Sequence, residues 1–172
     1  MRSVPILILL PMLATAASAF AAGPAPEIER PVAPPQAVGS AHSLRTIPEA
    51  CARLEGAFTG DAAEPYRFAA VRTRANCQPR ARFVDAARAD PGVANGWILN
   101  DLIRVPSAAC AGQQAVVRVW RKPAAASPPD LDAQGRSRIY LQDSKQTAGA
   151  ARDRVPMFAA EMTVEGRACA QE

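Results

Sequence analysis

Histidine is almost missing from this chain: His42 is the only one in 172 residues. Ser-His-Asp and Cys-His catalysis both need an imidazole held beside the nucleophile. We expect His42 to lie in a flexible leader rather than in the folded part of the chain. The scarcity of histidine therefore argues strongly against both mechanisms.

The short motifs that hold cofactors and metals are also missing. The sequence contains no G-x-S-x-G, no P-loop, no dinucleotide-binding fingerprint and no H-E-x-x-H. It has no C-x-x-C pair either, which disfavours both a zinc site and thiol-based redox chemistry. The sequence therefore predicts no metal, no cofactor and no catalytic residue.

No apolar run approaches the ~20 residues that a membrane-spanning helix needs. The chain starts with Arg2, continues with an apolar run over 4–13 and then reads Ala17-Ser18-Ala19. A positive start, a short apolar run and an A-x-A site are typical of a secretory signal peptide. We expect residues 1–19 to be removed, with cleavage as late as Ala22 as the alternative. The mature chain is then periplasmic or secreted and has no transmembrane segment.

Lysine is scarce as well, since Lys122 and Lys145 are the only two. Basic residues number 20 against 16 acidic ones, giving a net charge of +4. An excess this mild does not predict specific binding to nucleic acid. The abundance of arginine, alanine and proline is typical of a GC-rich genome, which weakens any argument that arginine was selected for anion binding.

The four cysteines are an even number, which in an exported chain predicts disulfides. Three pairings are possible. We favour Cys51–Cys77 and Cys110–Cys169, because one pair then lies in the amino half and the other brackets the carboxyl half. Each loop closed in this way stabilises the fold by about 3–4 kcal/mol in the chain-entropy model.

The proline-rich and alanine-rich residues 20–43 predict a flexible leader, because such a segment has little to bury. Residues 44–172 are then expected to form a single disulfide-stapled globular domain. Thr46 and Glu49 have the spacing of a capping box, and Gly56 is a helix stop, so we expect a short helix between them.

Downstream of that helix, alternating apolar residues and turn signals predict several short strands. The expected strands span 65–74, 80–88, 97–106, 114–121, 138–141 and 156–164. For 97–106 a helix is the alternative. The predicted fold class is α+β, with the short N-terminal helix packed on an antiparallel sheet of about five or six strands. A small closed β-barrel is the alternative.

A cluster of arginines is the strongest positive signal. Residues 67–88 contain six arginines and the single acid Asp85. In a hairpin of 65–74 with 80–88, side chains two residues apart point the same way. The arginines then expected to share one face and to attract phosphate, sulfate or carboxylate groups are Arg72, Arg74, Arg80 and Arg82. A solvated charged face is the favoured interpretation, and an anion site is the alternative. The partner is not identified by the sequence; an acidic envelope glycan or lipid is the candidate that the anion site would bind.

Carboxylates are the remaining catalytic candidates. Asp61 lies near Glu64 in sequence, and Asp101 interrupts an apolar strand. A pair of carboxylates can cleave glycosidic bonds, but Asp101 is more simply explained by an ion pair with an arginine. Trp97 and Trp120 are expected in the core, with a ligand groove as the alternative. The predicted function is a non-catalytic envelope or secreted protein; the alternative is a small secreted hydrolase.

The cysteines give the first testable prediction. In protein purified after natural export, alkylation without reductant should label no cysteine, and mass spectrometry after reduction should show all of them labelled. Labelling of any cysteine in the unreduced protein would contradict the predicted pairing and indicate a reactive or metal-binding thiol.

Overall fold

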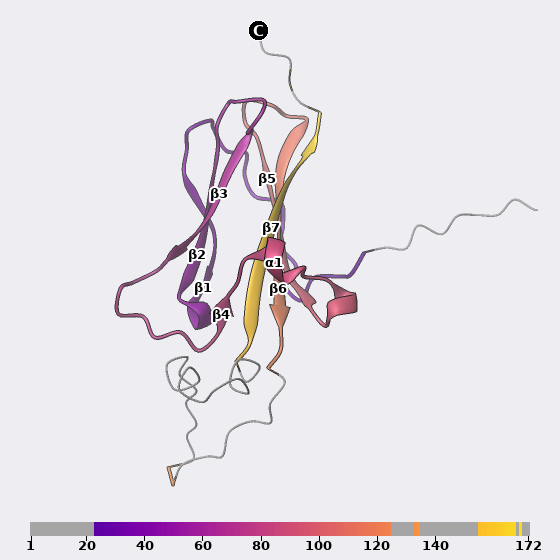
Figure 1. Cartoon of the computed structure of the whole chain (residues 1–172). Helices are drawn as coiled ribbons and strands as arrows, with labels where there is room; N and C mark the ends of the chain where they lie inside the picture. Colours follow the sequence, from indigo (N-terminus) through magenta and orange to yellow (C-terminus); the bar gives the residue numbers. More distant parts are fainter. Residues whose placement is uncertain (1–22, 125–132, 135–154, 168, 170–172) are drawn as a thin grey trace, which may run out of the picture.

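The computed structural model describes residues 23–124, 133–134, 155–167 and 169. These residues form two open β-sheets that face each other (Figure 1). The first sheet contains β1 (His42–Ile47), β2 (Ala52–Phe58) and β3 (Tyr66–Arg72), in that order. The second has the order β4 (Arg82–Phe83), β7 (Met157–Gly166), β6 (Gln113–Lys122), β5 (Ile98–Pro106).

Neighbouring strands are antiparallel, except for β4, which runs parallel to β7. The short helices are η1 (Pro48–Ala50), α1 (Ala86–Ala89) and η2 (Val93–Asn95). The described part of the chain is thus mostly β, and neither sheet closes into the small barrel that was the alternative. Within these residues no helix is long and apolar enough to cross a membrane.

The expected helix between Thr46 and Gly56 is wrong. The chain instead forms the β1–β2 hairpin, which turns through η1 and through Cys51 at a φ of 53°. Burial along β2 alternates strictly, so the apolar positions follow a period of two rather than 3.6. The capping-box spacing was therefore misleading, and Pro48 begins a single 3-10 turn.

The expected hairpin of 65–74 with 80–88 is also wrong. β3 pairs with β2, whereas Arg82 and Phe83 pair with β7 in the second sheet. The chain then enters α1, where the Asp85 carboxylate accepts a hydrogen bond from the Ala87 amide at 3.0 Å. This N-cap explains why the residues after Phe83 leave the sheet.

The strands expected over 97–106, 114–121 and 156–164 are confirmed as β5, β6 and β7. The one expected over 138–141 lies outside the described residues, as does the segment 1–22. Residues 114–121 had the clearest strand pattern in the sequence, and the helix that was the alternative for 97–106 does not form.

Residues 27–39 run along the strands instead of forming the flexible leader expected there. Ile28 donates its amide hydrogen to Asn100 O at 2.8 Å, and Ala33 donates to Arg104 O at 2.9 Å. Further along, the Gly39 amide donates to Phe58 O at 2.8 Å. This segment therefore covers the free edge of β5 and crosses to the first sheet. We call residues 27–39 the N-terminal strap.

The main core lies between the two sheets, with Leu54 and Phe58 of β2 against Val117, Val119 and Phe158. A second cluster contains Trp97, Leu99, Trp120 and Ala159, against which side chains of the α1 segment pack. Both tryptophans are more than nine-tenths buried, so they lie in the core as expected rather than in a groove. The two apolar clusters provide the burial that holds the second sheet on both faces.

Both favoured disulfides are present, Cys51–Cys77 and Cys110–Cys169. The first ties the β1–β2 turn to the loop after β3. The second joins the segment after β5 to the chain beyond β7. Disulfides of this kind persist in oxidising compartments, which supports an extracytoplasmic location.

Gly56 in the centre of β2 lies directly beneath the Tyr66 ring, in the place where any other residue would put its Cβ. Tyr66 is held there by burial, by an edge-to-face contact with Phe58 at a centroid distance of 4.8 Å, and by a hydrogen bond with His42. The ring has little freedom to move aside.

Gly56→Ala should therefore destabilise the protein by about 1–3 kcal/mol through overpacking. Chemical denaturation measures the loss, and Gly92→Ala is the matched control, because a Cβ at Gly92 meets no atom within 4 Å. Equal stability of the two variants would show that the Tyr66 ring is not fixed over Gly56.

Candidate functional site

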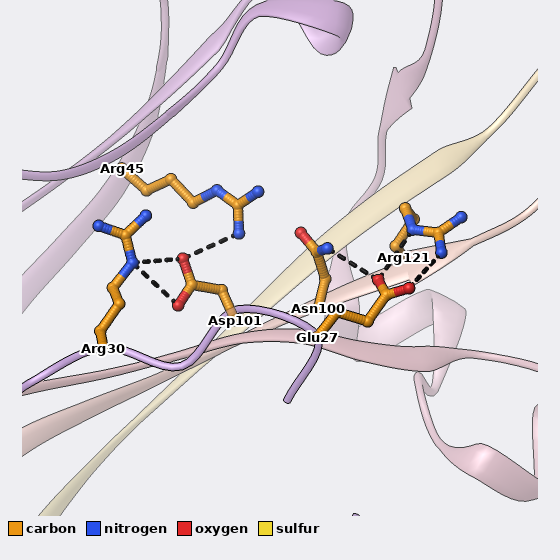
Figure 2. Close-up of polar contacts among 6 residues, drawn as sticks. All are labelled: Glu27, Arg30, Arg45, Asn100, Asp101 and Arg121. Atoms are coloured by element: carbon orange, nitrogen blue, oxygen red, sulfur yellow. Dashed lines mark hydrogen bonds and ion pairs between the residues drawn. The ribbon is translucent and has the colours of Figure 1, made fainter. Parts of the chain in front are cut away.

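Asp101, the buried acid of β5, is the centre of an ion cluster (Figure 2). Its side chain is fully buried. Arg30 of the strap donates from Nε to Oδ1 at 3.1 Å and to Oδ2 at 2.8 Å. Arg45 of β1 donates from Nη1 to Oδ2 at 2.9 Å. The interpretation of Asp101 as an ion-paired residue is thus the one that fits.

The cluster links three separate segments of the chain: the strap, the first sheet and the second sheet. Asp101 sits at a bulge of β5 and forms a backbone bridge with Ile28. Burial lowers the pKa of Arg45, and the Asp101 charge opposes that shift. Both carboxylate oxygens of Asp101 accept hydrogen bonds from guanidinium groups.

A second polar cluster lies beside the first. The Glu27 carboxylate accepts from Arg121 Nε at 3.0 Å and from Asn100 Nδ2 at 2.9 Å (Figure 2). The hydrogen bond from Arg121, with that from Asn100, lowers the pKa of Glu27, so its charge persists to lower pH. Both clusters fasten the strap to β5 and β6.

The other predicted carboxylates do not form a catalytic pair. Asp61 Oδ1 accepts from the Ala63 amide at 2.8 Å, which folds the β2–β3 loop back on itself. Asp61 lines a hollow of about 160 Å³ next to Cys110 and Cys169, and Glu64 is not part of its lining. The structure therefore gives Asp61 a turn-forming role.

Arg72, one of the four predicted anion-binding residues, is occupied by the chain itself. Its Nε donates to Arg74 O at 2.9 Å, and its Nη2 donates to Ala75 O at 3.0 Å and to Cys77 O at 2.8 Å. Arg72 thereby ties the loop after β3 to the end of the strand. Its role is to shape the loop that carries the other arginines.

The remaining predicted arginines, Arg74, Arg80 and Arg82, form no ion pair among the described residues. They come to the same end of the molecule although the expected hairpin does not form. The Arg80 amide donates to Glu49 O at 2.7 Å, and the Arg82 amide donates to Pro156 O at 2.9 Å. We call residues 72–82 the arginine loop.

The arginine loop borders a hollow of about 200 Å³, which is lined mainly by small and apolar side chains. Arg72, Pro79 and Phe83 contribute to its wall, together with Cys51 of the disulfide. A ligand at this end can therefore contact an apolar surface as well as guanidinium groups.

Sequence reasoning missed a further hollow, of about 350 Å³, on the outer face of the first sheet. Its floor is made of small residues such as Ala57 and Ala69, and its charged groups are Glu55 and Arg67. The sequence analysis expected a helix over much of β2, so the pairing of Ala57 and Ala69 on one sheet face could not be anticipated.

His42 was expected in the leader, but it is part of β1 and half-buried. Its Nδ1 lies 3.1 Å from Ser40 O, and its Nε2 lies 2.7 Å from the Tyr66 hydroxyl. Burial raises the pKa of Tyr66, so the phenol remains protonated and can donate to the imidazole. The histidine thus supports the Tyr66 ring over Gly56.

Comparisons with known proteins give no relative for this chain: no family model, no curated protein and no solved structure matches it. The residues described by the structure also contain no group of three or more potential metal ligands. The function must therefore be argued from the chain's own surface.

The Asp101 cluster gives a stability prediction. Asp101→Asn should destabilise the protein by about 3 kcal/mol, because it leaves Arg45 buried without a counter-charge. Denaturant unfolding measures the loss. Asp61→Asn, which removes an exposed charge while keeping the turn-forming oxygen, should change stability little. Equal effects of both substitutions would mean that the cluster is not essential to the fold.

Proposed function

We propose that this protein is an exported, non-catalytic binding module whose arginine loop binds an anionic ligand. One observation carries the proposal: Arg74, Arg80 and Arg82 have no acidic partner among the residues that the structure describes. Six other arginines form ion pairs there, namely Arg30, Arg45, Arg53, Arg88, Arg118 and Arg121. Residues 65–84 contain five arginines and no acid. Such a cluster attracts phosphate, sulfate or carboxylate groups.

The arginine loop is held in place before any ligand arrives. Cys51–Cys77 fixes its middle, and the Arg72 guanidinium bonds three of its carbonyl groups. The amides of Arg80 and Ala81 both donate to Glu49 O, at 2.7 and 2.8 Å. A preorganised loop loses less conformational entropy on binding, which favours a binding role.

The ligand class follows from charge and compartment. The disulfides are consistent with a periplasmic or secreted protein, where acidic glycans and anionic lipid headgroups are the abundant polyanions. Guanidinium groups on separate backbone segments suit a polymer with repeated charges better than a single small anion. We therefore propose an acidic envelope glycan or lipid headgroup as the ligand.

The alternative function, a hydrolase with a carboxylate pair, has less support. Asp61 is the carboxylate that lines the hollow beside the disulfide Cys110–Cys169. Glu55 is the carboxylate that lines the hollow on the outer face of the first sheet. Neither set of lining residues brings two carboxyl groups together, as glycoside cleavage requires. No observation on the described residues favours this function.

The proposal predicts salt-sensitive binding to polygalacturonate. Replacement of Arg74, Arg80 and Arg82 by glutamine should weaken binding at least about tenfold at low ionic strength and flatten its dependence on salt. Calorimetry or a salt-gradient polyanion column measures both effects.

The control variant has Arg53, Arg88 and Arg104 replaced by glutamine. It loses the same three positive charges, but at positions outside the arginine loop. Two of these residues are already paired, with Glu55 and Asp85. If both triple variants weaken binding equally, only overall charge matters and the arginine loop is not the site. Absence of binding by the wild-type protein to polygalacturonate and to anionic vesicles would also reject the proposal.

A further inference from the structure

β3 is one of the two outer strands of the first sheet, and on the edge that faces away from β2 its main-chain groups have no partner among the described residues. Thr59 N donates to Pro65 O at 3.1 Å, and Thr73 N donates to Cys51 O at 2.9 Å. These two bonds fix which residues of the antiparallel pair face β2. By alternation, the residues of β3 that point their N–H and C=O groups outward are Tyr66, Phe68, Ala70 and Arg72.

No described residue pairs with these outward groups, since β3 has β2 as its only neighbour in the sheet. The edge is also sterically open at its centre, where Ala69 and Ala70 are exposed. It carries no proline, no lysine and no bulge, and its two charged side chains, Arg67 and Arg72, lie toward its ends, away from this centre. β3 is therefore available to pair with another extended chain.

The strap covers β5 and reaches across to the end of β2. β4 pairs with β7 at Met157 and Phe158, so the rest of the β7 edge has no neighbouring strand among the described residues. Half-buried apolar side chains of β3 and β7 pack against the core, namely Phe68, Ala160, Met162 and Val164. Figure 1 shows β3 and β7 on the two facing sheets. An added strand would extend the first sheet and cover some of this apolar surface.

We propose that β3 binds an extended, acidic segment of a partner protein by β-strand addition. The main-chain bonds come from Phe68 and Ala70, with Tyr66 and Arg72 at the ends. The segment has apolar residues on the side of Phe68 and carboxylates on the side of Arg67. β-augmentation of this kind obtains affinity from backbone bonds and specificity from alternate side chains.

Charge complementarity selects an acidic segment. β3 carries no acid, its Arg67 lies on the face opposite Phe68, and the positively charged arginine loop continues from its end. This positive charge disfavours a second copy of this chain, because pairing two β3 strands would bring two positively charged surfaces together. This inference goes beyond the proposed function, because it adds a protein partner at the edge of β3, next to the arginine loop for which a glycan or lipid headgroup is proposed.

The probe is a capped synthetic peptide of alternating glutamate and valine, about as long as β3. The control is the same peptide with N-methyl groups on alternate backbone amides. The two have equal charge, but the methylated backbone cannot donate hydrogen bonds along one edge. Calorimetry should show the unmethylated peptide binding at least about tenfold more tightly.

Two variants locate the effect. Ala70→Pro removes one outward N–H, at an edge position where proline is tolerated, and should abolish the preference for the unmethylated peptide. Ala70→Val keeps the N–H and should retain the preference. Thermal unfolding checks that both variants are folded; should Ala70→Pro fail this check, Arg67→Gln replaces it and should weaken binding of the unmethylated peptide.

The outcomes separate the two proposals. If both peptides bind wild type equally and the arginine-loop variant binds neither, the proposed function stands and the strand addition is wrong. If neither peptide binds while polygalacturonate does, the strand addition is also wrong and the ligand is a glycan. Peptide-independent dimerisation that Ala70→Pro abolishes would mean that a second copy occupies the edge, which overturns the partner proposal.

Discussion

The buried carboxylate of Asp101 is the interaction on which the arrangement of the two sheets depends. It lies in the second sheet and receives one guanidinium from the strap and one from the first sheet. Removing a charge from water is costly unless its partners are fixed. Asp101 therefore requires both Arg30 and Arg45 in place, and so it joins the strap and both sheets on one side of the sandwich.

The two sides of the sandwich differ, and this difference underlies the proposed binding site. The strap pairs with β5 and reaches the end of β2, and the Asp101 cluster ties it to β1. On the side of β3, the described residues leave the outer edge of that strand without a main-chain partner, and the arginine loop follows it. The disulfide Cys51–Cys77 ties this loop to the turn after β1. A rigid scaffold with an open strand edge and excess positive charge is consistent with the proposed binding role.

Part of this account could be predicted from sequence. The cysteine pairing followed from position along the chain, and β5, β6 and β7 followed from long apolar strand patterns. Asp101 was marked by its place within an apolar strand, although its partner Arg30 lies 71 residues away and could not be inferred from local pattern.

The errors have physical causes. Thr46 and Glu49 have helix-start spacing, but the tertiary pairing of β1 with β2 outweighs a preference worth about 1 kcal/mol. The strap has the composition of a flexible leader, yet its backbone bonds to β5 depend little on side chains. The arginines were predicted to share a hairpin face, whereas contacts between distant segments bring them to one end.

Residue-resolved amide hydrogen exchange tests the central claim, that β3 is an open edge beside a fixed arginine loop. In the free protein, the account predicts fast exchange at Phe68 and Ala70 and slow exchange at Arg67 and Ala69, whose amides bond β2. Slow exchange at all four amides would contradict it, because the outward groups of β3 would then already be paired.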